Sequence, residues 1–407
     1  MRTILLTRLM ASAAALLCVA ACGSGGGATS SPVSVVPGVT PTSTPSATPT
    51  PTPTPTSTPV ATQAVGVSGL HLTLNGQTWL PRSVVIRGFV ATPAYLKANL
   101  PGTYTGTVNY GAAELAAATA FGADTLRFQV SQPSLDPQSP LYDATYAASV
   151  TAAIKQARGA GFVVMISMQD ETNSGETGFN PFASASTVRD WDALNATFGT
   201  DRGVLYELYN EPRPAKSAAN WALWAYGGTN AAGASDPVAI GMQPLLNHLR
   251  AAGSQNVMVL DGLGIGRTLD GVPTINDPLG RVVYAVHPYQ RGSDDESKWD
   301  TDFGIPSTKM PVWADEWSAG FGADIGLGNL TSYQVAVDLL NYLRDHSIPL
   351  GGGAFDVPGV MTQSVPGWAP TTYKGSTPAN PMGNSGQLVR TLFTTNYSRP
   401  LTAADGL

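Results

Sequence analysis

Two glutamates each close an apolar run that is typical of a buried strand. Glu211 lies in Asn210-Glu211-Pro212 at the end of the run 204–209, and Glu316 closes the run 311–315. Hydrolysis of a glycosidic bond needs one carboxyl group held protonated beside the leaving oxygen and another kept ionised across the sugar. The chain therefore offers the pair of side chains that this chemistry requires.

The elements that must position this pair follow from an alternation of eight short apolar runs with Ala-rich or Leu-rich stretches of helical spacing. This alternation indicates parallel βαβ units, and eight of them predict one (β/α)8 TIM barrel, an α/β fold, over residues 65–405. Before them, Asn75-Gly76 separates two short runs and predicts a small N-terminal β-hairpin with a primed turn, at the bottom of the barrel. The predicted barrel strands are 84–90, 124–130, 162–168, 204–210, 257–261, 282–287, 312–316 and 352–357.

Chemistry in a TIM barrel takes place at the carboxyl ends of the strands. Besides the two glutamates, this rule selects Asn210, His287, Tyr289 and Trp317, and Arg127 in the second strand could reach the same mouth. A fixed positive charge or a hydrogen-bond donor nearby would keep a nucleophilic carboxylate ionised. Asn210 could donate to a sugar 2-hydroxyl, a contact that strengthens in the transition state.

Other acids near the two glutamates are rivals for a role. Asp315 precedes Glu316, and because side chains alternate along a strand, only one of the two is expected to face the barrel axis. Glu207 has the same parity as Glu211, so it is interpreted as a buried, hydrogen-bonding acid. Three further acids, Asp170, Glu171 and Glu176, could bind sugar hydroxyls or be solvated loop charges.

Several motifs, in order and spacing, resemble those of glycoside hydrolase family 5, the cellulase-type family. The strongest is the segment 205–213, and the others are Arg87-Gly88, Leu126-Arg127-Phe128, His287-Pro288-Tyr289 and Ala314-Asp315-Glu316-Trp317. The resemblance implies that Glu211 is the acid/base and Glu316 the nucleophile of a retaining enzyme. It further implies that Asn210 binds the 2-hydroxyl and that Arg127, His287 and Tyr289 orient the carboxylates. No metal and no cofactor are expected, in agreement with the lack of a His/Cys cluster at metal-ligand spacing.

The chain departs from the family pattern at two places that shape the central sugar subsite. The third strand ends in Met168-Gln169-Asp170-Glu171 where the family usually has histidine, and residues 352–356 of the eighth strand lack the usual tryptophan. Trp368 could supply the missing platform. Trp221, Trp224, Trp299 and Trp317 could also stack on sugars, although at least two are expected to be packing residues, as is Trp191.

The predicted activity is that of a retaining endo-β-1,4-glycanase acting on a β-linked polysaccharide, with cellulose-like or mixed-linkage glucan favoured. Mannan is the alternative substrate within the class. A transglycosylase would use the same two carboxylates, and a catalytically silent carbohydrate-binding barrel would use the same groove. The net charge of −6 comes with scattered Lys and Arg, which argues against nucleic acid as a partner. A monomer is expected.

The N-terminal residues predict export. Arg2 and Arg8 precede an apolar stretch that leads into Val19-Ala20-Ala21-Cys22-Gly23. This pattern resembles a bacterial lipoprotein signal, residues 1–21, with lipid on Cys22. An ordinary secretory signal is the alternative. Residues 22–64, rich in Thr, Pro and Ser, predict a disordered tether, so the catalytic domain is expected to be anchored at the cell envelope or secreted.

Overall fold

The computed structural model describes residues 63–90, 92, 110–170, 180–229, 238–289, 295–319, 332–364, 366–373 and 386–407 of the 407-residue chain. The predictions for the signal peptide, for Cys22 and for the linker up to residue 62 lie outside the described residues. Those for Glu171 and Glu176 do so too. None of the described helices is long and apolar enough to cross a membrane.

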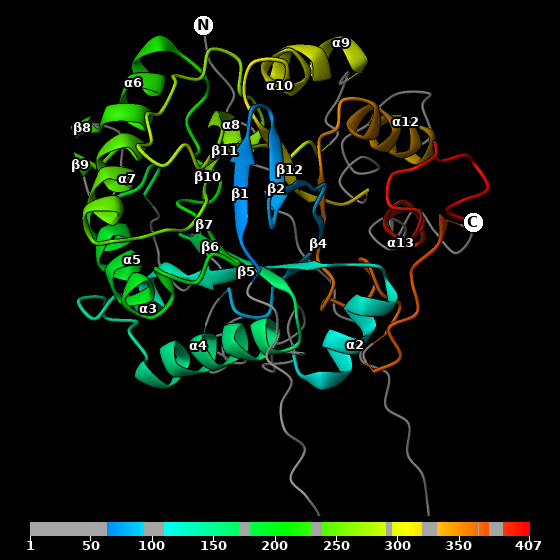
Figure 1. Ribbon diagram of the computed structural model, residues 1–407, viewed down its shortest axis with the longest axis horizontal. Helices are drawn as coiled ribbons and strands as arrows, with labels where there is room; N and C mark the ends of the chain where they lie inside the picture. Colours follow the sequence, from blue (N-terminus) through cyan, green and yellow to red (C-terminus); the bar gives the residue numbers. More distant parts are fainter. Residues whose placement is uncertain are drawn as a thin grey trace, which may run out of the picture. The chain divides into compact units, whose positions relative to one another are not determined.

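Eight parallel strands close into a barrel in the order β10-β11-β12-β13-β4-β5-β6-β7, which confirms the predicted TIM barrel. Figure 1 shows the helices arranged around these strands. The strands are β4 (Arg82–Ile86), β5 (Thr125–Ser131), β6 (Val163–Gln169), β7 (Val204–Glu207), β10 (Met258–Asp261), β11 (Val282–Ala285), β12 (Val312–Trp317) and β13 (Leu350–Gly352).

The helices pack on the outside of the barrel and form the larger core with the outward-facing strand residues. Leu126 and Phe128 of β5 and Val150 and Ile154 of the long helix α4 belong to this core. The helices are α2 (Ala112–Ala120), α3 (Gln132–Leu135), α4 (Ala144–Gly159), α5 (Ala185–Phe198), α6 (Ala218–Tyr226), α7 (Met242–Ala251), α8 (Leu263–Gly266), α9 (Glu296–Trp299), α10 (Ile305–Ser307), α12 (Ser332–Asp345) and α13 (Gly386–Thr394), with a π-helical turn η2 (Asp300–Gly304) and a short pair β8 (Gly228–Thr229) and β9 (Val238–Ala239).

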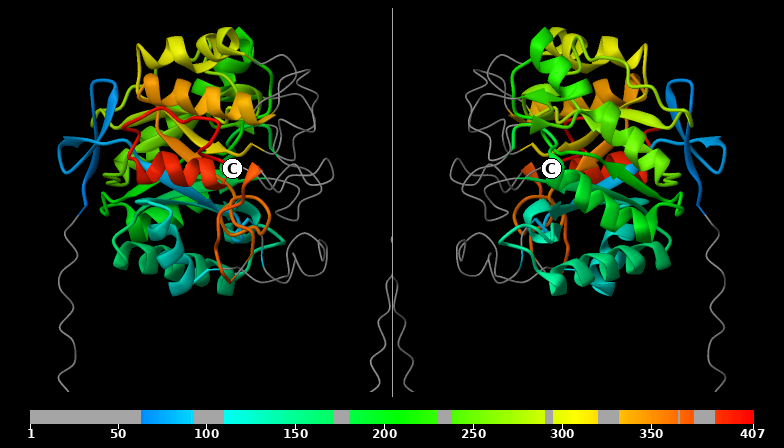
Figure 2. Two further views of the ribbon diagram at one scale, coloured as in Figure 1. Left: turned by 90° about the vertical axis from the view of Figure 1, so that its right-hand side faces the viewer. Right: turned by 90° about the vertical axis from the view of Figure 1, so that its left-hand side faces the viewer.

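A three-stranded antiparallel sheet covers the amino-terminal end of the barrel, where a two-stranded hairpin was predicted. Its strands are β1 (Val65–Ser68), β2 (His71–Leu74) and β3 (Gln77–Thr78). The turn has positive φ at Asn75 and Gly76, as the primed turn requires. Leu72 packs with inward-facing barrel residues such as Met165, and Figure 2 shows the sheet at one end of the barrel.

The eighth strand is the one whose bounds were predicted least well, since β13 ends at Gly352 and the prediction began there. Beyond it the chain stays beside β4, because the main-chain N–H of Phe355 donates to the oxygen of Val85 at 2.8 Å. The carboxylate of Asp356 accepts hydrogen bonds from the main-chain N–H groups of Arg87 (2.8 Å) and Gly88 (2.6 Å), which ties this segment to the end of β4.

One buried acid on α2 makes the stability of the fold depend on pH. Glu114 is 1% exposed, and burial, with Asp356 nearby, raises its pKa from 4.5 to about 10. A raised pKa stabilises the fold below the unfolded value, and this contribution is lost as the pH rises towards about 10. In the wild type, the free energy of unfolding should therefore be lower at pH 8 than at pH 5. In Glu114→Gln this difference should be smaller by at least about 1 kcal/mol, as measured by urea denaturation at both pH values.

The control is Glu296→Gln, because Glu296 is an exposed acid of α9. Its substitution should leave the difference between the two pH values unchanged. An equal response of both variants would contradict the assignment to Glu114.

Candidate active site

The barrel interior changes from apolar to polar towards the carboxyl ends of the strands. Lower inward-facing positions hold residues such as Val163 and Leu205, which pack against the N-terminal sheet. Nearer the carboxyl ends of the strands the inward positions are polar or charged, and the strand alternation places them together. These buried residues are Arg127, Gln129, Ser167, Gln169, Glu207, Asp261, His287 and Asp315.

Arg127 of β5 lies at the centre of the polar layer with no exposed side-chain surface. Its Nε and Nη2 donate to the two oxygens of Glu207 at 2.5 and 2.6 Å, and Nη1 donates to Glu316 Oε2 at 2.5 Å. Nη2 also donates to Asn210 Oδ1 at 2.8 Å, which turns the amide nitrogen of Asn210 away from the guanidinium. One guanidinium thus orients both Glu316 and Asn210. Glu207 is the buried, hydrogen-bonded acid that the sequence predicted.

Glu316 on β12 is held in its ionised form. Oε2 accepts from Arg127 and from Gln129 Nε2, both at 2.5 Å, and Oε1 accepts from the hydroxyl of Tyr289 at 2.9 Å. Burial by itself would raise the pKa of Glu316, but the positive charges of Arg127 and His287 and the other donors lower it to about 2. A carboxylate with this environment is suited to act as a nucleophile at neutral pH.

Glu211 is the more exposed of the two carboxylates, with 18% of its side chain exposed against 9% for Glu316. Its Oε1 lies 2.9 Å from Nδ1 of His287, which places the predicted orienting histidine beside it. Its backbone has a φ of 52°, in the left-handed region that non-glycine residues seldom occupy. Its main-chain N–H donates to Asp261 Oδ2 at 2.8 Å.

The fold brings the two glutamates together from strands that are far apart in sequence. Glu211, His287 and Glu316 each offer an atom, and these three atoms lie within 4.8 Å of one another. The structure thus collects Arg127, Asn210, Glu211, His287, Tyr289 and Glu316 in one place.

The expectation that only one of Asp315 and Glu316 faces the barrel interior is wrong. Asp315 Oδ2 lies 3.6 Å from Arg127 Nε, while Glu316 Oε2 lies 2.5 Å from Arg127 Nη1. The register between β12 and β13 shifts between Ala314 and Trp317, so strict alternation does not hold there. Such an irregularity redirects a side chain, and here it brings two successive acids to the same guanidinium.

The structure does not support a stacking role for Trp317, because its side chain is 0% exposed and lies in the core between barrel and helices. Trp221, Trp224 and Trp299 are buried too, as is Trp191, which was predicted to be a core residue. Trp368 is half-buried and stacks on Phe355 with ring centroids 5.4 Å apart. Phe355 in turn meets Phe121 at the end of α2, so this stack belongs to the packing outside the barrel.

The departure from the family pattern after the third strand places Gln169 and Asp170 at the end of β6. Gln169, at the end of β6, is buried and donates through Nε2 to Ser167 Oγ at 2.7 Å. Asp170 follows it and accepts from the main-chain N–H of Asn180 at 3.0 Å. Asp170 is 4% exposed, so it is not a solvated loop charge.

Sequence reasoning did not select Gln129, although it contacts Glu316 directly. Its Nε2 donates to Glu316, and its Oε1 accepts from Arg87 Nη1 at 3.1 Å. The available signal was parity, because Gln129 lies two residues after Arg127 on β5 and therefore faces the same side. Asp261, at the end of β10, was missed for another reason, because the strand-end rule was not applied to that strand.

Gln129→Met is expected to lower kcat/KM by about 10–100-fold, since a hydrogen bond to a charged group contributes about 1.5–3 kcal/mol. A donor to the ionised form lowers a carboxyl pKa, so its loss should also move the acidic limb of the pH profile upwards. Values of kcat/KM for glycan hydrolysis, measured from pH 3 to pH 8, test both the lower rate and the shift of the acidic limb. Gln156→Met, on the exposed face of α4, is the control. An unchanged acidic limb would show that Gln129 does not act on Glu316.

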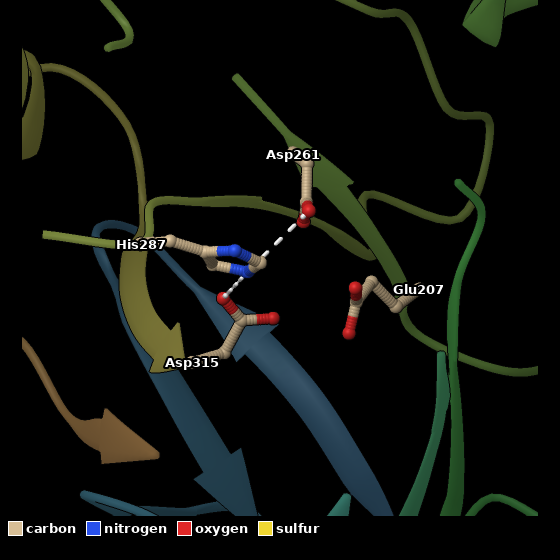
Figure 3. A group of neighbouring side chains, drawn as sticks. All are labelled: Glu207, Asp261, His287 and Asp315. Carbon is tan, nitrogen blue, oxygen red and sulfur yellow. Dashed lines mark ion pairs between the residues drawn. The ribbon is translucent and has the colours of Figure 1, made fainter. Parts of the chain in front are cut away.

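Four buried side chains below the two glutamates place potential ligand atoms within 4.8 Å of one another, namely Glu207, Asp261, His287 and Asp315 (Figure 3). Both oxygens of Glu207 already accept from Arg127, whose guanidinium also faces Asp315. A divalent cation would have to compete with these charges. The four residues belong to the network of ion pairs around Arg127 and His287.

A closed parallel barrel that gathers two glutamates, an arginine and a histidine at its strand ends defines a TIM-barrel glycosidase. The family model for cellulase, glycosyl hydrolase family 5, matches residues 94–348, more than half of the chain. The chain belongs to glycosyl hydrolase family 5. No protein of curated function matches its sequence.

Solved structures share the fold. A β-glucanase from Saccharophagus degradans is similar with a TM-score of 0.57 at 16% identity, over 85% of this chain and 98% of that one. The catalytic domain of an endoglucanase from Thermobifida fusca, in complex with cellotetraose, is similar with a TM-score of 0.57 at 16% identity, over 82% and 98%. An endogalactoceramidase is similar with a TM-score of 0.53 at 16% identity, over 71% and 74%.

Proposed function

We propose that this chain is a retaining endo-β-1,4-glycanase of the cellulase type, with Glu211 as the acid/base and Glu316 as the nucleophile. The observation that carries the proposal is the short separation of the two carboxylates, whose nearest atoms lie within 4.8 Å. Retaining enzymes hold their carboxyl groups about 5–5.5 Å apart, whereas inverting enzymes leave about 6.5–9.5 Å for a water molecule.

The two steps use the environments described above. Glu316 attacks the anomeric carbon while Glu211 gives its proton to the leaving oxygen, and a covalent glycosyl–enzyme forms as the glycosidic bond breaks. Glu211 then takes a proton from water, whose oxygen displaces Glu316 from the same carbon. Two inversions at one carbon retain its configuration. Asn210 binds the 2-hydroxyl of the sugar, and Arg127 and Tyr289 keep Glu316 ionised and oriented.

The favoured substrate is a cellulose-like or mixed-linkage β-glucan. Two proteins with the same fold, the β-glucanase and the endoglucanase, have been solved in complex with cellotetraose, which supports this choice. Mannan is the alternative within the class. The chain has Gln169-Asp170 where the family usually has histidine after the third strand, so the polysaccharide panel decides between the two substrates.

The enzyme is further proposed to act outside the cytoplasm as a monomer, tethered through lipid on Cys22 and the linker 22–64. The lipobox-like sequence before Cys22 supports this location. Labelling of growing cells with a fatty acid tests it, since the label should enter the wild-type protein and not Cys22→Ala.

Reducing-sugar release from a panel of β-glucans, mannans and xylans tests the activity, with protein that starts at Gln63 and so keeps the whole of β1. One polymer should be cleaved, and Glu211→Gln and Glu316→Gln should both lose that activity. Proton NMR of the first products should show the β-anomer before mutarotation. Binding of a polymer without cleavage would instead favour a silent carbohydrate-binding barrel, and an initial α-anomer would exclude the retaining mechanism.

A further inference from the structure

The imidazole of His287 lies between Glu211 on one side and two buried carboxylates on the other. Its Nδ1 lies 2.9 Å from Glu211 Oε1, and its Nε2 lies 3.3 Å from Asp315 Oδ1 and 3.4 Å from Asp261 Oδ2. Figure 3 shows His287 between Asp261 and Asp315, with Glu207 set apart from the ring. Nδ1 thus lies within hydrogen-bond distance of one carboxylate and Nε2 forms ion pairs with two others, an arrangement that suits a protonated, positively charged ring.

A stabilising effect on the fold does not explain why Asp261 and Asp315 are buried. Both are 0% exposed, and neither oxygen of Asp315 has a hydrogen-bond partner among the described residues. A buried carboxylate without hydrogen bonds destabilises a fold. The ion pairs of Asp315 join it to His287 and Arg127, which contact Glu211 and Glu316 respectively. Burial would lower the pKa of His287, but Asp261 and Glu316 raise it well above its usual value.

Asp261 has a second contact with the same glutamate. Its Oδ2 accepts a hydrogen bond from the main-chain N–H of Glu211. The positive φ of Glu211 is unfavourable for a non-glycine residue, so contacts with the surrounding structure must offset it. Asp261 is itself fixed, because Trp224 of α6 donates to its main-chain oxygen at 2.9 Å. Gly266 also packs against the His287 ring. A Cβ at this position would lie 2.9 Å from His287 Cγ, so any side chain there would push against the ring.

We propose that Asp261 and Asp315 are positioning residues for Glu211. They hold His287 with its Nδ1–H directed at Glu211 Oε1, and Asp261 also holds the main chain of Glu211. The proposal rests on the acid/base role of Glu211 given under the proposed function. It predicts that loss of either aspartate impairs proton transfer to the leaving oxygen more than it impairs attack by Glu316.

The test compares two substrates of the glycan cleaved in the polysaccharide panel. A 2,4-dinitrophenyl glycoside needs no proton on its leaving group, whereas the unsubstituted oligosaccharide does. In Asp261→Asn and Asp315→Asn, kcat/KM for the oligosaccharide should fall at least about tenfold more than kcat/KM for the dinitrophenyl glycoside. Gly266→Ala changes no charge but presses a Cβ against the ring from a position with a φ of 65°, and it should show the same larger loss on the oligosaccharide. Glu114→Gln removes a buried acid elsewhere and should show none.

Equal losses on both substrates would mean a merely structural role and would overturn the proposal. So would wild-type ratios in the two aspartate variants, or a divalent metal bound one per chain in the wild type and lost in both variants. Glu211→Ala separates this failure from failure of the proposed function. If Glu211→Ala itself lacks the bias towards the dinitrophenyl glycoside, then Glu211 is not the acid/base.

Discussion

Glu316→Ala is expected to lower kcat by on the order of 10⁴-fold or more, the largest effect of any single substitution in this chain. Removal of a nucleophile abolishes the covalent step and leaves only the acceleration that binding and electrostatics supply. The pKa of about 2 means that the wild-type carboxylate is ionised throughout the neutral range. Initial rates on the glycan identified in the panel measure the loss.

Azide distinguishes a lost nucleophile from a disrupted site. In Glu316→Ala, the anion can enter the space of the missing carboxylate and displace a dinitrophenyl group once, which gives an α-glycosyl azide from a β-glycoside. In Glu211→Ala, azide instead attacks the glycosyl–enzyme and gives the β-product. The same configuration from both variants, or no rescue in either, would contradict the assignment of the two roles.

Arg127→Met is expected to lower both stability and activity. The guanidinium compensates the carboxylates of Glu207, Asp315 and Glu316, and its loss leaves buried negative charge unpaired. Breaking a buried ion network in this way costs about 3–5 kcal/mol in the free energy of unfolding. Activity should fall as well, because Glu316 loses the charge that keeps it ionised and Asn210 loses the donor that orients it.

Arg399→Met provides the matched comparison, because the Arg399 side chain is 45% exposed and pairs with Asp405 near the C-terminus. A surface ion pair contributes little in water, so this variant should lose much less stability and keep its activity. Urea denaturation and rates on the cleaved glycan measure both quantities. Similar losses of stability in the two variants would contradict a central role for Arg127.

Much of the site could be predicted because a TIM barrel converts strand order into location. Once residues 204–210 and 312–316 were interpreted as barrel strands, Glu211 and Glu316 had to lie at the same end. Glu207 followed from parity with Glu211, and Arg127 from its place in a strand that leads to the same mouth. Gln129 and Asp261 could have been found by the same two rules. The burial of the tryptophans could not be predicted, since a Trp in a loop and a Trp under a helix look the same in the sequence.

The sequence by itself determined the class of fold, the glycosidase family and the end of the barrel at which the two glutamates lie, because hydrophobic alternation and strand-end residues are local properties of the chain. Only the tertiary structure decided which side chains touch. The register shift between β12 and β13 brings Asp315 and Glu316 to one guanidinium, against the alternation rule. The main-chain N–H of Glu211, whose backbone is left-handed, donates to Asp261, fifty positions away in the chain. Such contacts depend on strand register and loop closure, which no local pattern records.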